Sequence, residues 1–477
     1  MPAMHVSVAA VAWFGWILAA CACASVVQAA PARERPVVAI TDVSVVDVEQ
    51  GRAVGPRTVL VVDGRIVAIG AQTEVHVPAD AQRVDGRGRF LIPGLVDMHV
   101  HLFNNASRRP PNTWAFALFV ANGVTAVREM AAEPASIATV DEWREAMARG
   151  DLVAPRVLAA GVVVRGTSPD DAAHRVDAAA DAGADFIKVF SEVPEANWRA
   201  ILDEARRRSL PVIGHVPAGV SLLTAAAAGQ RSNEHLMQAF EACTTIEQSM
   251  LDNRRGLDSE QLVARRDAEE ARVLDAYDQD TCDRVATALA ATGQVQVPTL
   301  VLAFTESKLD PRSPETDSRW RYLRPDERAR WLRILAGVTP QDRAVAARRW
   351  TVAREITSTF HRAGVPVLAG TDTPMPRVYP GFSLHEELEH LVESGMSPQA
   401  ALRAATLAPA SFLGISDTAG SVAVGKRADL VILDADPLSD IHNTRRIHAV
   451  LLDGRLLTRS ALDALLAKAE NTAGSAH

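Results

Sequence analysis

The chain has 477 residues, which is long enough for a large barrel together with a smaller accessory domain. Its apolar fraction of 48% and charged fraction of 23% are those of an ordinary soluble globular protein. The formal net charge is −8 and no basic stripe is visible in the sequence, so we do not expect nucleic acid as a partner.

The first segment, residues 1–30, differs from the rest of the chain and predicts a signal peptide. A nearly continuous apolar run over 6–24 leads into small residues, and 27–29 resemble a signal-peptidase site. No Lys or Arg precedes this run, so an uncleaved membrane anchor is one alternative. Residues 18–21 also resemble a bacterial lipobox, in which Cys21 would carry a lipid. We expect a secreted or periplasmic protein, with lipid anchoring at Cys21 as the alternative.

Both ends of the mature chain are rich in predicted strands. Residues 36–92 contain short β-rich runs, and Asp63-Gly64 supplies a hairpin turn between two of them. Residues 416–460 repeat this style. Each half is too small to bury a core alone, so we predict one small β-sandwich formed from both chain ends. Residues 461–477 are predicted as a C-terminal helix and tail, frayed from 469 onward.

Residues 93–415 alternate apolar strands with helical stretches, many of them rich in alanine, and predict an α/β fold, a (β/α)8 TIM barrel. The strands are expected at 94–99, 124–128, 156–160, 186–190, 212–215, 231–235, 295–300 and 365–370. Two connections, 237–294 and 302–364, are long. Loops of this length are usually functional or contain helices of their own.

Six side chains that bind metals well lie at the C-terminal ends of these strands, where a parallel barrel keeps its chemistry. They are His99, His101, Lys188, His215, His235 and Asp372. His99 and His101 are two positions apart, so both point to one face of their strand. Six ligands exceed the need of one tetrahedral ion, and imidazole suits zinc. We therefore expect two divalent ions, with zinc as the expected metal.

Paired ions lower the pKa of a bridging water towards roughly 7 and polarise a carbonyl group. Asp372 is then the expected catalytic base, and later the acid that protonates the leaving amine. Gly370 should let the backbone approach the site closely.

Lys188 interrupts an otherwise apolar strand and should point into the barrel. A buried ammonium without a partner costs several kcal/mol in order of magnitude. The amine can become neutral, or it can react with carbon dioxide to form a carbamate that bridges two cations. The alternative is an ion pair with Asp185 or Glu192, and the four nearby histidines favour the carbamate.

Over residues 37–457 the chain resembles the amidohydrolase superfamily. Within it, the chain resembles the imidazolonepropionase-like branch, which contains prolidase-type and Xaa-Arg-type metallodipeptidases. The matching stretches are Leu91–His101, Gly123–Arg128, Asp185–Phe190, Leu368–Thr373 and Gly425–Val431. The resemblance assigns ligands to two ions: His99, His101 and Asp372 to the first, His215 and His235 to the second, and carboxylated Lys188 to both.

Three residues are candidate substrate contacts. Arg128 ends the second strand and could receive a substrate carboxylate in bidentate fashion, or it could pair structurally with Glu129 or a neighbouring acid. Tyr379 lies in the loop after strand eight, and His385 begins the helix that follows.

Without the leader, the chain has two cysteines, Cys243 and Cys282. In an oxidising compartment such an isolated pair is a disulfide candidate, and two buried free thiols are the alternative.

The leading hypothesis is a hydrolase that cleaves amide bonds in small peptides or N-acyl amino acids. A lactonase, cyclic-imide hydrolase or deaminase is the alternative within the same fold, although Lys188 argues against a single-metal deaminase. A non-catalytic metal-binding protein is a third hypothesis. The expected partner is a small-molecule substrate, and self-association into a homo-oligomer is left open.

Overall fold

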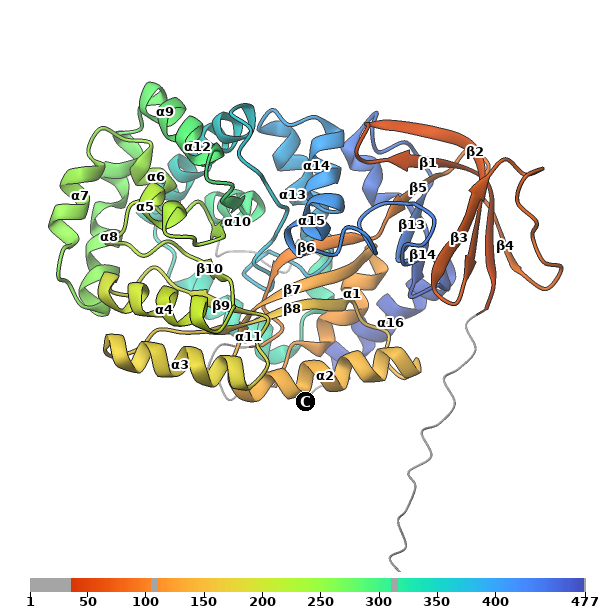
Figure 1. Ribbon diagram of the computed structural model, residues 1–477, viewed down its shortest axis with the longest axis horizontal. Helices are drawn as coiled ribbons and strands as arrows, with labels where there is room; N and C mark the ends of the chain where they lie inside the picture. Colours follow the sequence, from red (N-terminus) through yellow and green to blue (C-terminus); the bar gives the residue numbers. More distant parts are fainter. Residues whose placement is uncertain (1–35, 104–109, 310–315, 476–477) are drawn as a thin grey trace, which may run out of the picture.

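The computed structural model describes residues 36–103, 110–309 and 316–475. A large barrel-like domain lies beside a strand-rich part (Figure 1). The predicted signal peptide and the lipidation candidate Cys21 fall outside the described residues. Within the described ranges, no helix is long and apolar enough to cross a membrane.

The strand-rich part is one eight-stranded sheet that contains both ends of the chain, in the order β15-β14-β13-β5-β1-β2-β3 with β4 beside β1. Its strands are β1 (Val38–Asp47), β2 (Arg52–Val62), β3 (Arg65–Gly70), β4 (Gln82–Asp85), β5 (Phe90–Pro93), β13 (Leu430–Leu433), β14 (Ile447–Leu452) and β15 (Arg455–Thr458). The two halves meet where β13 pairs antiparallel with β5.

The expected sandwich of two sheets differs from this arrangement. The segment 425–428 returns to β3, where the N–H of Ile66 donates to the carbonyl of Lys426 at 2.9 Å. The single sheet therefore rolls around its own apolar core. Its strand β13 serves two cores: Leu430 and Ile432 belong to the core of the sheet, whereas Val431 and Leu433 pack into the barrel. One face of the sheet thus covers the barrel, so no second sheet is needed there.

The barrel-like domain is built around eight chain segments, here called staves, which lie where the eight barrel strands were predicted. Seven are strands: β6 (Leu95–Val100), β7 (Val124–Ala132), β8 (Arg156–Val163), β9 (Phe186–Val189), β10 (Val212–Gly214), β11 (Ser232–Glu234) and β12 (Val295–Val297). The eighth is the segment 365–373, which joins β12 through Val367 and β6 through Thr373. A hydrogen bond of 2.8 Å from the N–H of Arg231 to the carbonyl of Val212 links β10 to β11.

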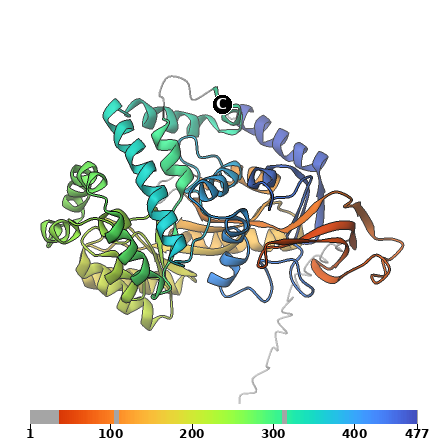
Figure 2. The ribbon, with the colours of Figure 1, turned by 90° about the horizontal axis from the view of Figure 1, so that it is seen from above.

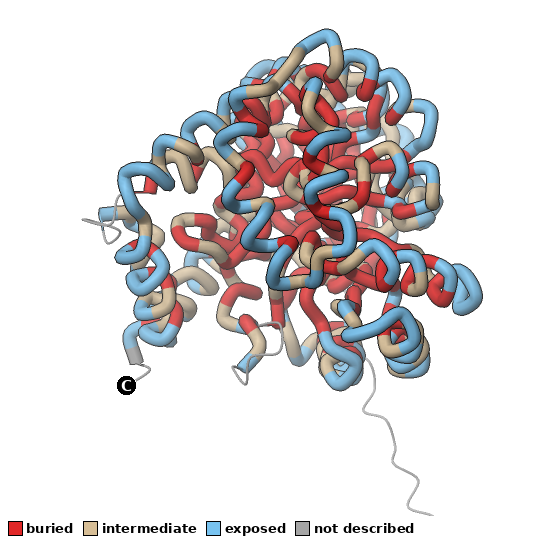
Figure 3. Tube along the Cα trace, turned by 90° about the vertical axis from the view of Figure 1, so that its left-hand side faces the viewer, coloured by how far each residue is buried: buried red, intermediate tan, exposed pale blue. Residues whose placement is uncertain are grey.

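Helices surround this barrel and leave the buried residues inside (Figures 1 and 3). They are α1 (Phe116–Ala121), α2 (Pro134–Arg149), α3 (Pro169–Asp181), α4 (Glu195–Arg207), α5 (Leu222–Ala227), α13 (Phe382–Glu393), α14 (Pro398–Ala404) and α15 (Leu407–Phe412), with the 3-10 turns η1 (Thr113–Ala115), η3 (Ser318–Tyr322) and η4 (Ile441–Arg445).

The last helix, α16 (Arg459–Ser475), runs through much of the predicted tail. The expected fraying from 469 was therefore wrong as far as residue 475. Leu462 and Ala473 are buried, and the helix packs against α1, so tertiary contacts hold its end.

Both long connections form helices. The first contains α6 (Ala239–Ala242), α7 (Glu247–Arg254), α8 (Ser259–Asp275) and α9 (Gln279–Ala290), and the second contains α10 (Leu300–Ser307), α11 (Pro325–Ala336) and α12 (Pro340–Arg362). Helix α12 packs against α8, α9 and α10, so the two connections form adjoining walls at one end of the barrel (Figure 2). A disulfide joins Cys243, after α6, to Cys282 in α9.

Candidate metal centre

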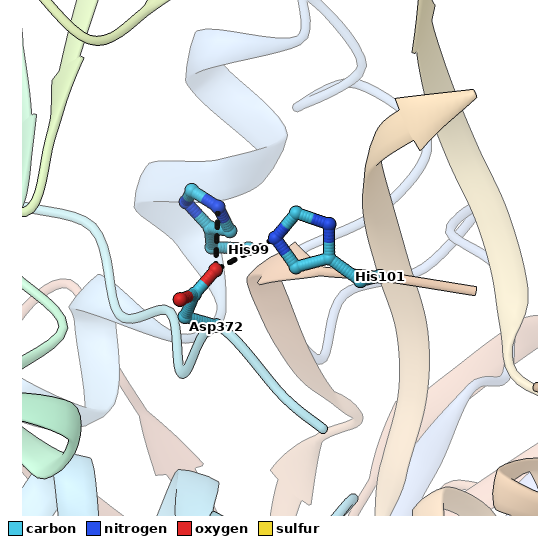
Figure 4. A group of neighbouring side chains, drawn as sticks. All are labelled: His99, His101 and Asp372. Atoms are coloured by element: carbon cyan, nitrogen blue, oxygen red, sulfur yellow. Dashed lines mark hydrogen bonds and ion pairs between the residues drawn. The ribbon is translucent and has the colours of Figure 1, made fainter. Parts of the chain in front are cut away.

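The first and last staves of the barrel bring three ligand side chains together. His99 lies in β6, His101 follows it, and Asp372 ends the segment 365–373 (Figure 4). Asp372 Oδ1 lies 3.1 Å from His99 Nε2 and 2.7 Å from His101 Nε2. One ligand atom from each residue falls within 4.8 Å of the others, which is close enough to hold a metal ion.

The backbone is shaped to bring these staves close. Asp372 has a φ of +64°, and its N–H donates to the carbonyl of His99 at 2.8 Å. A Cβ on Gly370 would lie 2.9 Å from His99 Cβ and 2.7 Å from Val297 Cγ1. Only glycine fits this approach without displacing His99.

Two further imidazoles lie beside this group. His235 Nε2 is 3.9 Å from Asp372 Oδ1, and the His215 ring centroid is 5.0 Å from that of His235. Thr299 Oγ1 donates to the carbonyl of Pro298, so it accepts from Nδ1 of His235 at 2.8 Å. This leaves the lone pair on Nε2 directed towards Asp372.

Burial lowers the pKa of His235 to about 3 and that of His215 well below its usual value. Both rings are thus neutral near pH 7, which is the form that binds metal ions.

Lys188 is fully buried on β9, and its Nζ has no hydrogen-bond partner within the described part of the chain. The alternative ion pairs do not form. Asp185 bonds Arg144 at 3.2 Å, and Glu192 bonds Arg165 at 2.7 Å. Burial lowers the pKa of Lys188 to about 8, which makes the neutral, nucleophilic amine accessible.

Sequence reasoning did not single out Glu234, although it lies directly before His235 at the end of a strand. This buried carboxylate accepts from Nδ1 of His99 at 2.8 Å and from Ser232 Oγ at 2.5 Å. Burial alone would raise the pKa of Glu234, but the Arg128 guanidinium beside it holds that pKa well below its usual range. Glu234 therefore fixes the His99 ring with Nε2 facing Asp372.

Arg128 is not placed to contact a substrate. It is fully buried, its Nη2 bonds both oxygens of Glu234 at 2.9 and 3.0 Å, and its Nε donates to the carbonyl of Met98 at 2.6 Å. Arg128 therefore forms a structural ion pair, which was the alternative to substrate binding. Its partner is Glu234, a neighbouring acid, rather than Glu129. Glu129 instead accepts from the backbone N–H of Ala131 at 2.6 Å.

The two remaining substrate candidates also lie in packed surroundings. Tyr379 is buried against Trp331, and the Arg319 guanidinium lies 4.4 Å from its ring centroid. His385 bonds Thr444 Oγ1 at 2.9 Å and the backbone carbonyl of Asn122 at 3.0 Å. These contacts hold both side chains in packed surroundings away from the candidate metal centre. The prediction failed because sequence position alone does not reveal which way a loop or helix turns its side chains.

A cavity of about 340 Å³ lies over the centre. His215, His235 and Asp372 contribute to its floor, and residues from both long connections form its walls. The apolar lining residues are Leu236, Met237, Phe240, Val273, Leu274, Pro298, Leu302, Ala303, Ala353 and Met375. A pocket of this size suits a small ligand.

Residues 90–276 and 322–457 match the Amidohydrolase family. The chain belongs to this family. The resemblance inferred from the strand-end motifs is therefore confirmed at the level of the superfamily.

Adenine deaminase 2 from Shouchella clausii is 28% identical over 200 residues, which are 38% of this chain and 34% of that protein. The chain thus matches about a third of this curated relative. Among solved structures, the bottromycin amidohydrolase is 27% identical with a TM-score of 0.68, covering 92% of this chain and 91% of its own. A Xaa-Pro dipeptidase with bound methionine shares the fold at 20% identity and a TM-score of 0.61, covering 88% of this chain and 100% of its own.

The family supports the expected class of enzyme, a hydrolase of carbon–nitrogen bonds.

Proposed function

We propose that the chain is a binuclear metal-dependent amidohydrolase that cleaves an amide bond in small peptides or N-acyl amino acids. The observation that carries this proposal is the Nζ of Lys188, buried without a hydrogen-bond partner and within electrostatic range of Asp372, His215 and His235. An uncompensated amine at that position is costly in the folded chain but useful as the precursor of a bridging ligand.

The donor set fits two divalent ions. His99, His101 and Asp372 would hold the first, and His215 and His235 the second, with zinc as the expected metal. The neutral Lys188 amine would attack the carbon of carbon dioxide, form a nitrogen–carbon bond and release one proton. The resulting carbamate would have two oxygens, so Lys188 could serve as a ligand to both ions.

When bound, the two ions would supply a water nucleophile at neutral pH and polarise the scissile carbonyl. The residues of the chain would do the remaining work. Asp372 would accept a proton from the attacking water and then pass it to the nitrogen of the leaving amine. Glu234 would hold the His99 ring in place, and the apolar cavity walls would exclude bulk water from the substrate.

A substrate panel and elemental analysis on the same metal-loaded protein test this function. We expect turnover of dipeptides or N-acyl amino acids and about two divalent ions per chain. The panel should include a cyclic imide and a lactone, because the same centre would serve those reactions. Turnover of these two alone would contradict the proposed substrate class, and full activity with one ion would contradict the binuclear centre.

Replacing Asp372 by Asn tests the proton transfer. The amide keeps the size of the side chain but cannot accept the proton from water. We expect turnover to fall by roughly 10²–10⁴-fold, or more if metal binding also weakens. Metal content must be measured in the same sample. Lost turnover with both ions retained supports Asp372 as the base, whereas near-parental turnover would assign the proton transfer to another group.

A further inference from the structure

Two arginines, Arg266 and Arg349, line the cavity over the metal centre, and they have different partners. Arg349 is saturated by two acids: its Nε donates to Glu270 at 2.5 Å and its Nη1 donates to Glu306 at 2.5 Å. The two carboxyl groups thus occupy this guanidinium from two sides. Arg349 is therefore unsuited to receive a further anion.

Arg266 is held much more loosely. Its Nε and Nη2 both donate to a single oxygen, Oδ1 of Asp267, at 3.1 and 2.9 Å. Asp267 is the next residue in the chain, and its side chain is 59% exposed. Exposed ion pairs of this kind contribute little to stability, so an incoming carboxylate can replace Asp267 at little cost.

A third contact places the Arg266 guanidinium at the rim of the centre. Its Nη1 donates to Ser191 Oγ at 2.6 Å. Ser191 lies three residues after Lys188, just past the C-terminal end of β9. The bond to Ser191 thus fixes a cation of helix α8 beside the stave that carries the predicted bridging lysine.

We propose that Arg266 binds a carboxylate of the substrate and makes the enzyme selective for amides that carry one. This inference rests on the proposed function and names the residue that the substrate meets. A guanidinium presents its N–H groups in a planar fork that matches the two oxygens of a carboxylate. Arg128 cannot fill this role, since Glu234 already occupies it inside the barrel.

The test compares the best substrate of the panel with its C-terminal carboxamide, which removes the negative charge and keeps the shape. A hydrogen-bonded charged group contributes about 1.5–3 kcal/mol, so we expect the parent to prefer the acid by roughly 10- to 100-fold in kcat/KM. Arg266→Met should lose this preference, mainly through a higher KM for the acid. Arg266→Lys should retain part of it.

Arg265→Met is the matched control, because Arg265 precedes Arg266 on the same helix but faces solvent. It makes the same change of charge, and we expect the preference for the acid to remain. An unchanged preference in Arg266→Met, with parental metal content and unfolding temperature, would overturn the proposal.

A binding measurement separates this inference from the proposed function. Calorimetry with N-acetyl-L-leucine and N-acetyl-L-leucinamide needs no turnover. If the parent hydrolyses nothing in the panel, the proposed function fails. Tighter binding of the acid by the parent, and not by Arg266→Met, would still support Arg266. Equal binding of the acid and the amide by the parent would refute its role.

Discussion

At the level of single residues, the candidate metal centre is supported by two buried charged side chains behind His99. Arg128 holds Glu234, and Glu234 holds the Nδ1 side of His99. A buried ion pair adds little net stability, but removing one partner leaves an uncompensated charge that costs about 3–5 kcal/mol. The Arg128–Glu234 pair therefore fixes the tautomer and the orientation of His99, independently of any metal ion.

Lys188→Ala is expected to abolish most turnover and to change stability little. The substitution removes the predicted bridge between the two ions. Because the ions would supply several kcal/mol of transition-state stabilisation, activity should fall at least roughly 10²-fold. A short carboxylic acid such as propionate should restore part of the rate by replacing the carbamate, whereas bicarbonate should not. Rates measured with and without propionate provide the test, and a variant with the parental rate would refute the carbamate.

Gly214→Ala is expected to disturb Lys188 through the backbone. Gly214 has a φ of +119°, and an added Cβ would lie 2.4 Å from the carbonyl oxygen of Val189 and 2.7 Å from Lys188 Cδ. Crowding in a packed interior costs about 1–3 kcal/mol in addition to the backbone strain. Urea unfolding and metal content should both be measured.

Gly229→Ala is the control for backbone strain alone. Gly229 has a φ of +95°, and an added Cβ would meet nothing within 4 Å. We expect a smaller loss of stability and normal metal binding in this variant. Equal losses in the two variants would mean that the contact with Lys188 is unimportant.

The meeting of His99, His101 and Asp372 could be predicted from the sequence, because strand periodicity and the position at strand ends determine where these side chains point. The environment of Arg128 could not be predicted in this way. Its partner Glu234 is 106 residues away along the chain, and only the closed barrel brings the two together. The direction of Tyr379 and His385 likewise depends on tertiary packing.

At the level of elements, both long connections contain helices, as loops of that length often do. Helix α8 (Ser259–Asp275) has a strong local signal at its start, where Asp258 and Gln261 form a capping box. The bounds of the strands were harder to predict, because short strands carry little local signal. Strands β10, β11 and β12 are only three residues long and shorter than the predicted ranges. The segment 365–373 has a strand pattern but joins its neighbours through isolated bridges.

The disulfide should be present in protein recovered from an oxidising compartment, to which the predicted leader would direct the chain. It links α9 to the end of α6, and both sulfurs are buried. Its 39-residue separation gives about 4 kcal/mol of stabilisation in the chain-entropy model. Mass spectrometry of unreduced peptides should find Cys243 joined to Cys282. Both thiols alkylated without reductant would contradict this prediction.

At the level of the whole molecule, the two chain ends are tied to the barrel through the strands that face both cores. Strands β1, β5, β13 and β14 each place some residues in the sheet core and others in the barrel core, so the two cores share these four strands. The joining of both ends was predictable, since neither half could bury a core alone. The rolling of the single sheet could not be predicted, because it depends on long-range pairing of 425–428 with β3.

The metal centre should also stabilise the barrel as a whole, because its predicted ligands come from five of the eight staves. Ions that bind the folded chain but not the unfolded chain stabilise it by about 4 kcal/mol when free metal is 1,000 times the Kd. We therefore expect chelator-treated full-length protein to unfold at a lower temperature, and added zinc to restore the midpoint in a concentration-dependent way. Chelator already saturated with zinc is the control and should have no effect. If metal-free and metal-loaded samples, verified by elemental analysis, unfold at the same temperature, then the ions do not join these staves.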